Sequence, residues 1–93
     1  MVIGLLSLEI HLPYSRSLKD KRKVLNTLRH RIQSRFNAAF AELDFQEKWQ
    51  RSKLGIVTLN SRQGLVDQML QKILQDVEEN LQGEIVLSEF RYF

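Results

Sequence analysis

The residues of this sequence that are best suited to chemistry are the lysines and arginines of one segment, residues 16–35. That segment holds eight of the fourteen basic residues and a single acid, Asp20, whereas acids outnumber bases in the rest of the chain. Five of its side chains share one arc of a helical wheel beside the apolar stripe, namely Lys19, Arg22, Lys23, Arg29 and His30. Such a stripe can contact successive phosphates of a nucleic acid. The alternative is a solvated helix face that keeps the protein soluble.

A polar stretch around the single tryptophan extends this basic segment. Trp49 could stack on an unpaired base while Lys48 and Arg51 hold phosphate. The alternative, which is the more common fate of a lone tryptophan, is that the ring caps the end of the core while Gln50 and Arg51 hold the loop in place. The predicted nucleic-acid-binding residues are Arg16, Lys19, Lys21, Arg22, Lys23, Arg29, Lys48, Trp49 and Arg51.

Lys21 occupies an unexpected position in this helix, because it shares an arc of the wheel with Leu28 and Ile32. One interpretation is that its stem passes the edge of the sheet and its ammonium reaches water. The other is that the ammonium is directed to a specific anion or to a carboxylate near the end of the first strand, such as Glu9. Both interpretations are compatible with the sequence.

Other polar residues do not form the pattern of a metal or catalytic site. Glu9 and His11 lie on one predicted strand and Glu42 and Asp44 on another, with a third strand between them, so the two pairs are roughly 10 Å apart. Metal ligands must converge more closely than that. The chain has no cysteine and no G-x-S-x-G motif, and its isolated glycines build no phosphate-binding loop. We therefore expect no metal, no cofactor and no enzymatic activity.

Six elements must position these residues. Alternating apolar residues predict strands at residues 2–12, 38–45, 53–60 and 84–93. Apolar residues at helical spacing predict two helices, which start at the N-caps Ser17 and Ser61 and end near Asn37 and Gly83. This order predicts one α+β domain over residues 1–93 with a ferredoxin-like βαββαβ fold, in which two helices cover one face of a four-stranded antiparallel sheet. The predicted core is Leu6, Leu8, Leu25, Leu28, Ile32, Leu43, Val66, Ile73 and Val77.

The other face of that sheet is predicted to be open. Ile3, Leu5 and Phe40 have the parity of outward-facing residues, and an apolar patch on an open sheet favours self-association. The final strand offers a second adhesive edge through Phe90, Tyr92 and Phe93.

The location of the protein is predicted from what its first residues lack. The first apolar stretch is interrupted by Gly4, Ser7 and Glu9, is too short to span a bilayer and follows no basic segment. The absence of cysteine fits a reducing compartment. We therefore expect a cytoplasmic protein without a membrane partner.

Two long stretches of the sequence resemble a known family. HLPYSRSLKDKRKVLNTLRHRI, followed by FNAAFAELDFQEKWQRSKLGIVTLNS, is similar to the YlxP-like family, a bacterial domain of unknown function. The matching pieces are residues 17–22 before a leucine-rich helix, the Phe36-Asn37 turn, and residues 49–51 just before Leu54-Gly55. The resemblance implies a ferredoxin-like fold. It also implies an RNA or ribosome setting, because family genes often lie beside genes for translation initiation and ribosome maturation.

Charge and resemblance together predict a non-enzymatic accessory factor that associates with RNA or a ribosomal subunit through its basic first helix. Residues 2–12 and 53–60 carry no aromatic side chain, so base stacking on the sheet, as in RNA-recognition motifs, is not expected. The alternative is a protein-interaction or homodimerisation module that uses the open sheet face or a strand edge. Salt dependence distinguishes the two, because only polyanion binding collapses at high salt.

Overall fold

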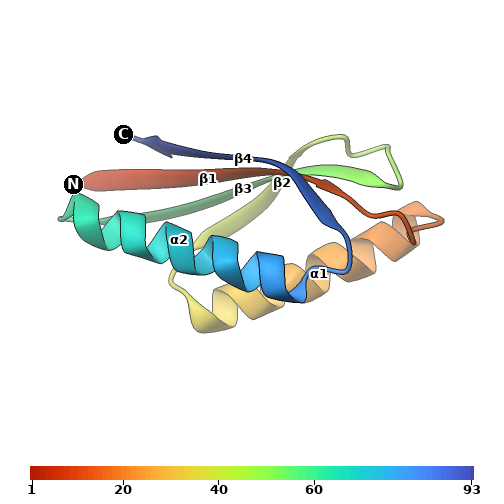
Figure 1. Ribbon diagram of the computed structural model, residues 1–93, viewed down its shortest axis with the longest axis horizontal. Helices are drawn as coiled ribbons and strands as arrows, with labels where there is room; N and C mark the ends of the chain where they lie inside the picture. Colours follow the sequence, from red (N-terminus) through yellow and green to blue (C-terminus); the bar gives the residue numbers. More distant parts are fainter.

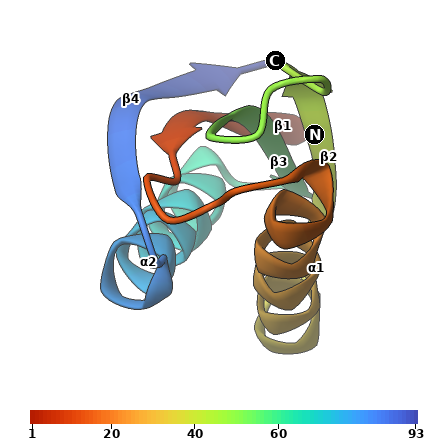
Figure 2. The same ribbon diagram turned by 90° about the vertical axis from the view of Figure 1, so that its right-hand side faces the viewer.

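The arrangement of strands and helices follows the predicted order. The computed structural model describes residues 1–93. Its elements are β1 (Val2–His11), α1 (Leu18–Arg35), β2 (Ala39–Asp44), β3 (Arg51–Asn60), α2 (Gln63–Asn80) and β4 (Glu84–Tyr92). The strands form one sheet in the order β2-β3-β1-β4, and all neighbours are antiparallel. Both helices lie on the same face of this sheet (Figures 1 and 2). The predicted ferredoxin-like βαββαβ fold is confirmed.

The core lies between the sheet and the two helices. Alternate residues of β1 point to the helix side, where Leu6, Leu8 and Ile10 are buried. In the register of the sheet, Leu6 lies opposite Ile56 and Leu8 opposite Leu54, both of which are also buried. The helices contribute Leu25, Leu28, Ile32, Val66, Leu70, Ile73 and Val77. The predicted core is therefore correct for every residue of β1, α1 and α2 that it named.

On β2 the predicted parity is wrong. Phe40 is 8% exposed and lies opposite the core residue Ile56, whereas Leu43 is 48% exposed. The pairing of β2 with β3 shifts between Glu42 and Asp44. Leu43 lies over Gly55 on the outer face, where a Cβ added to Gly55 would be 2.7 Å from Cδ1 of Leu43. Side chains alternate along a strand, so one large ring directed to the core sets the orientation of its neighbours.

The two helices begin in different ways. Ser17 caps α1 as predicted, because its Oγ accepts a hydrogen bond from the amide of Asp20 at 3.0 Å. The predicted cap Ser61 does not cap α2. The N-cap residue is Arg62, which makes no capping hydrogen bond with its side chain, and Asn60 Oδ1 instead accepts from the amide of Ser61 at 2.7 Å.

Gly83 does not end α2 in the way that a C-terminal glycine usually does. The helix ends at Asn80 with Leu81 as its C-cap, and no glycine of the chain has a positive φ. Instead, a Cβ at Gly83 would lie 2.5 Å from the carbonyl oxygen of His11. Glycine is required here because the chain passes directly against the end of β1 before it enters β4.

The outer face of the sheet is not covered by any helix (Figure 2). Its apolar residues include Ile3, Leu5 and Val57, which are half-buried, and Leu59, which is 60% exposed. Phe93 extends this end of the sheet, where its backbone exchanges two hydrogen bonds with Ile3. Phe40, which was predicted to contribute to this face, does not.

Candidate nucleic-acid interface

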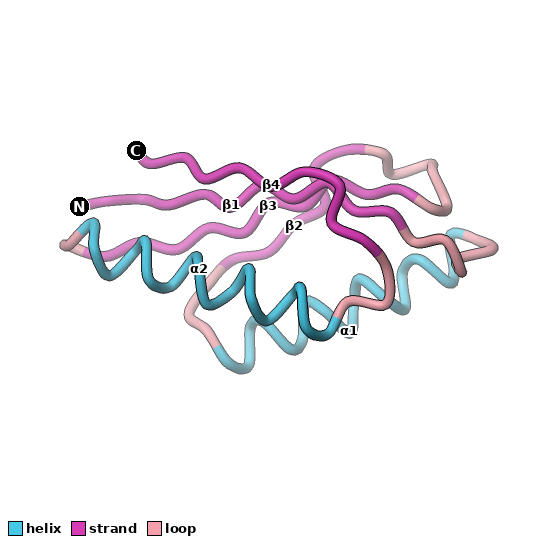
Figure 3. The backbone as a smooth tube through the Cα atoms, viewed as in Figure 1, coloured by secondary structure: helices cyan, strands magenta, loops and turns pink.

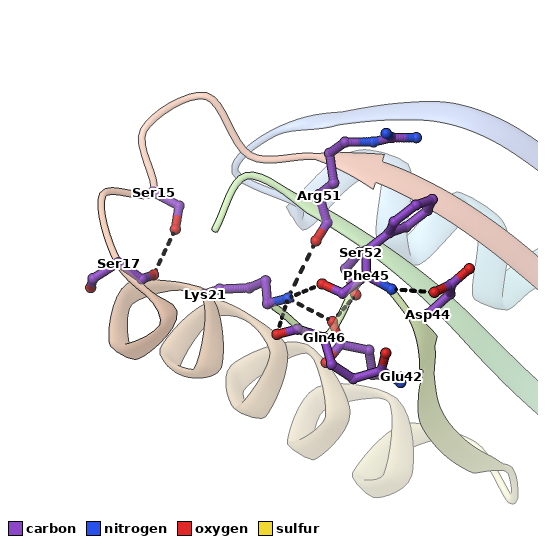
Figure 4. Close-up of polar contacts among 9 residues, drawn as sticks. All are labelled: Ser15, Ser17, Lys21, Glu42, Asp44, Phe45, Gln46, Arg51 and Ser52. Atoms are coloured by element: carbon purple, nitrogen blue, oxygen red, sulfur yellow. Dashed lines mark hydrogen bonds and ion pairs between the residues drawn. The ribbon is translucent and has the colours of Figure 1, made fainter. Parts of the chain in front are cut away.

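Lys21 lies at the centre of a polar cluster that joins α1 to the connection between β2 and β3, residues 45–50 (Figure 4). Its side chain is 2% exposed, and its Nζ lies 2.9 Å from Glu42 Oε2. The ammonium also donates to three backbone carbonyl oxygens, at 2.8, 3.3 and 3.3 Å, which belong to Phe45, Gln46 and Arg51. The Ser52 hydroxyl donates to the same oxygen of Glu42 at 2.6 Å. Every strong donor of this cluster therefore has a partner.

This burial corrects two predictions about Lys21. The residue cannot contact RNA, because its charge is enclosed by Glu42 and the three carbonyl oxygens. Of the two interpretations left open for this side chain, the structure has the ammonium directed to a carboxylate, but that partner is Glu42 and not Glu9. Glu9 instead lies on the outer face, where Arg51 Nη2 contacts its Oε1 at 3.0 Å.

Two other cations of residues 16–35 also hold the structure together. Arg31 Nε and Arg35 Nη1 lie 2.7 and 3.3 Å from the carboxylate of Asp76 on α2. Asp76 is 8% exposed, so this contact fastens α1 to α2 from within the helix layer. The sequence analysis missed it. The available signal was the spacing of Arg31 and Arg35 by one helical turn, together with an acid next to Val77 in the apolar stripe of α2.

The two loops at one end of the molecule are fastened to each other. Gln50 Nε2 donates to the carbonyl oxygens of Pro13 and Ser15 at 3.2 and 3.1 Å, and the Leu12 amide donates to the Gln50 carbonyl at 2.8 Å. The connection between β1 and α1, residues 12–17, therefore lies beside residues 45–50, and both loops are at the same end of the fold (Figure 3). The predicted role of Gln50 in holding the loop is consistent with these contacts.

Trp49 does not cap the core. Its side chain is 55% exposed, and Tyr14 on the adjoining loop is 86% exposed. The interpretation of Trp49 as a cap is wrong, because the contacts that order its loop are polar and come from Lys21 and Gln50. The sequence analysis did not single out Tyr14.

The remaining predicted cations fall into two groups. One group is exposed and takes part in none of the five ion pairs of the protein: Arg16, Lys19, Arg22, Lys23 and Lys48. These residues belong to the first turns of α1 and to the two loops. Together with Tyr14 and Trp49 they define a surface that we name the basic–aromatic end.

Arg29 and Arg51 are engaged with other groups of the protein. The Arg29 guanidinium carbon is 5.4 Å from the ring centroid of Phe40, farther along α1. Arg51 is on the outer face of the sheet, where it pairs with Glu9 and lies 4.1 Å from the ring centroid of Phe45. Its charge is therefore partly compensated within the protein.

The carboxylates of the sequence do not assemble with histidine into a ligand set. Glu42 faces α1, whereas Glu9 and His11 lie on the outer face, and His11 Nδ1 is 3.8 Å from Glu84. No three histidine, aspartate or glutamate side chains lie close enough together to hold a metal ion.

Comparison with known proteins agrees with the resemblance in sequence. A family model described as a protein of unknown function, DUF503, matches residues 3–90. The chain belongs to this family. It is 29% identical over 92 residues to the uncharacterized protein YlxP of Bacillus subtilis (strain 168), a match that covers 99% of this chain and 100% of that protein.

Among solved structures, the designed protein Ferredog-Diesel is similar with a TM-score of 0.48 and 13% identity, over 98% of this chain and 83% of that one.

Proposed function

We propose that this protein is a cytoplasmic, non-enzymatic accessory factor that binds RNA, free or within a ribosomal subunit, through the phosphate backbone. The observation that carries the proposal is the separation of its cations into two classes. Lys21, Arg31 and Arg35 are used to hold α1 in place, whereas the five cations of the basic–aromatic end have no carboxylate partner. Neither helix combines the length and apolar character that a membrane crossing requires.

Electrostatics supports this assignment. Residues 12–23 and 45–50 contain only two carboxylates. One of them, Asp20, already accepts a hydrogen bond from the Arg16 amide at 3.0 Å. The other is Glu47, in the loop. Uncompensated cations repel one another, and a bound polyanion relieves that repulsion. Each phosphate contact with a single strand releases condensed counterions, so log affinity falls against log salt with a slope of about −0.7 per contact.

The test is RNA binding measured by fluorescence anisotropy over a salt series. Four or five contacts give the wild type a slope of roughly −3. The triple variant Lys19→Gln, Arg22→Gln and Lys23→Gln removes three contacts without touching the core, and should bring the slope to roughly −1.

A matched control removes the same charge elsewhere. Arg62, Lys72 and Arg91 are exposed and make no ion pair. Arg62 is the N-cap of α2, Lys72 lies on α2 and Arg91 lies on β4. Their replacement by glutamine should reduce affinity far less. Equal affinity and equal salt slope for the wild type and the α1 triple variant would refute the proposal, as would equal losses in the two triple variants.

A protein-interaction or homodimerisation role is the second candidate, and the uncovered outer face favours it. Leu59, Leu43 and Leu87 are 60%, 48% and 51% exposed on or beside that face. Contact through an apolar face survives high salt, unlike polyanion binding. Sedimentation velocity at high micromolar concentration in low and high salt tests this role. Only monomer under both conditions would exclude dimerisation through this face.

A further inference from the structure

The two most exposed aromatic side chains in the loops of the protein lie at the basic–aromatic end, where five cations have no ion-pair partner. Tyr14 is 86% exposed and Trp49 is 55% exposed. Removing a large aromatic ring from water is favourable. Two exposed rings on neighbouring loops therefore require an explanation. Both belong to the same end of the fold as the unpaired cations Arg16, Lys19, Arg22, Lys23 and Lys48.

The loops that carry these rings are held from two directions. From the helix side, Lys21 donates to the carbonyl oxygens of Phe45 and Gln46 at the start of the loop. From the side of the other loop, the Gln50 amide donates to the carbonyl oxygens on both sides of Tyr14. Both rings are thus attached to backbone that is held by hydrogen bonds on either side.

The surroundings of Trp49 are polar. An open hollow beside its ring is lined otherwise by His11, Glu47, Lys48, Gln50 and Arg51. An apolar peptide side chain would find one aromatic surface and mainly polar side chains there. A nucleobase matches the hollow better, because its flat face stacks on the indole while its polar edge meets hydrogen-bonding side chains.

We infer that the basic–aromatic end binds unpaired RNA, with bases stacked on Trp49 and Tyr14 and phosphates held by the surrounding cations. This inference rests on the proposed function and specifies its ligand as single-stranded RNA. Duplex RNA is excluded as the preferred ligand because its bases are already stacked on each other and offer no free face. Stacking on aromatic rings tolerates any base, so the site selects for strand state more than for sequence.

The decisive variant is Tyr14→Leu combined with Trp49→Leu, which keeps apolar side chains but removes both flat rings. The probes are a labelled oligouridylate, a labelled oligoadenylate and an RNA duplex of equal length. For the wild type we expect tighter binding of the single strands. For the variant we expect single-strand affinity to fall about 5-fold to 140-fold for each base that loses its stack. The salt slope should stay unchanged, because the phosphate contacts remain.

Two controls accompany this variant. Trp49→Phe retains a stacking ring and should preserve most of the affinity. Phe93→Leu removes a 68% exposed ring that lies beside the start of β1, at the opposite end of the sheet from the two loops, and should leave RNA affinity unchanged. Since Trp49 is the sole tryptophan, its fluorescence reports the contact directly, and quenching by single-stranded RNA but not by the duplex is expected.

The outcomes separate this inference from the proposed function. If the leucine variant binds single strands as tightly as the wild type while the α1 triple variant does not, stacking is refuted and phosphate binding stands. If the wild type binds neither RNA, both are refuted. If the leucine variant loses binding of the duplex to the same extent, the rings act on loop shape and the inference is overturned. Thermal unfolding equal to that of the wild type verifies that the variant is folded.

Discussion

Replacing Lys21 by methionine removes the charge from the cluster that joins α1 to the connection between β2 and β3. Methionine preserves most of the buried stem, so the change isolates the ammonium. Glu42 is then left with the Ser52 hydroxyl as its only partner, and the carbonyl oxygen of Phe45 loses a 2.8 Å hydrogen bond. Removing one partner of a buried ion pair costs about 3–5 kcal/mol.

The position of Glu42 sets the expected value within that range. Its side chain is 20% exposed, so water reaches it once the ammonium is gone, and Gln46 and Arg51 are exposed residues whose carbonyl groups can also be hydrated. We therefore expect the low end, about 3 kcal/mol of unfolding free energy. For a domain of this size the melting temperature should fall by roughly 12–24 °C.

A double-mutant cycle measured by urea unfolding tests the cause of this loss. Glu42→Met in the Lys21→Met background removes the carboxylate that was left without its charge partner. The double variant should be more stable than Lys21→Met alone by at least about 1 kcal/mol. Lys23→Met, two residues farther along α1 and exposed, should change stability by no more than about 0.5 kcal/mol. If the double variant is no more stable than Lys21→Met, the buried-pair reasoning is wrong.

Three further predictions concern other contacts. Gly83→Ala should lose about 1–3 kcal/mol in urea unfolding through its clash with backbone, whereas Gly64→Ala, which meets no atom within 4 Å, should gain about 0.5 kcal/mol; equal effects would contradict this. Asp76→Asn should lower the free energy of unfolding by about 2 kcal/mol in the same measurement. A loss that becomes smaller in high salt would contradict this, because it would identify the ion pair as a surface contact. A hydrogen bond to Asp67, burial and the charge of that carboxylate, in this order, raise the pKa of Tyr92 above 10.0. The stability that Tyr92 contributes should therefore be complete below pH 10.0 and disappear as the pH rises through the folded-state pKa; a phenolate absorbance titration of a variant lacking the other tyrosine checks this, and a midpoint at or below 10.0 would disprove it.

Periodicity predicted the fold because most elements contain enough residues to define one face. β1 has four alternating apolar residues, and each helix has a stripe of several turns. β2 has only six residues, and its two faces offered a choice between Ala39, Ala41 and Leu43 on one side and Phe40 on the other. The number of apolar residues favoured the face of Ala39, Ala41 and Leu43 as the buried one. In the structure the face of Phe40 is buried instead, because it places the large phenyl ring in the core and Glu42 beside its partner Lys21.

The candidate site was less accessible to sequence analysis, because exposure and pairing depend on tertiary contacts. The placement of Lys21 on an apolar arc was compatible with an ammonium that reaches water and with one that binds a carboxylate, and identifying Glu42 required the correct parity of β2. A lone tryptophan commonly caps the core of a small domain. The hydrogen bonds of Gln50 show that the loop of Trp49 is held in place without burial of the indole ring. That Arg31 is engaged and Lys23 is free could not be read from the charges of this helix alone, because the signal for the Arg31 contact lies partly in the acid of α2, Asp76.

The central position of β1 limits the order in which this protein can fold. Both of its neighbours in the sheet follow it at a distance in the sequence: Val2 pairs with Asn60 on β3, and Gly4 pairs with Tyr92 on β4. Pairing between residues so far apart in sequence is slow to form. Until β4 is made, an apolar strand has at least one free hydrogen-bonding edge, which is a template for aggregation. The chain is therefore most open to wrong strand pairing before β4 has joined the sheet.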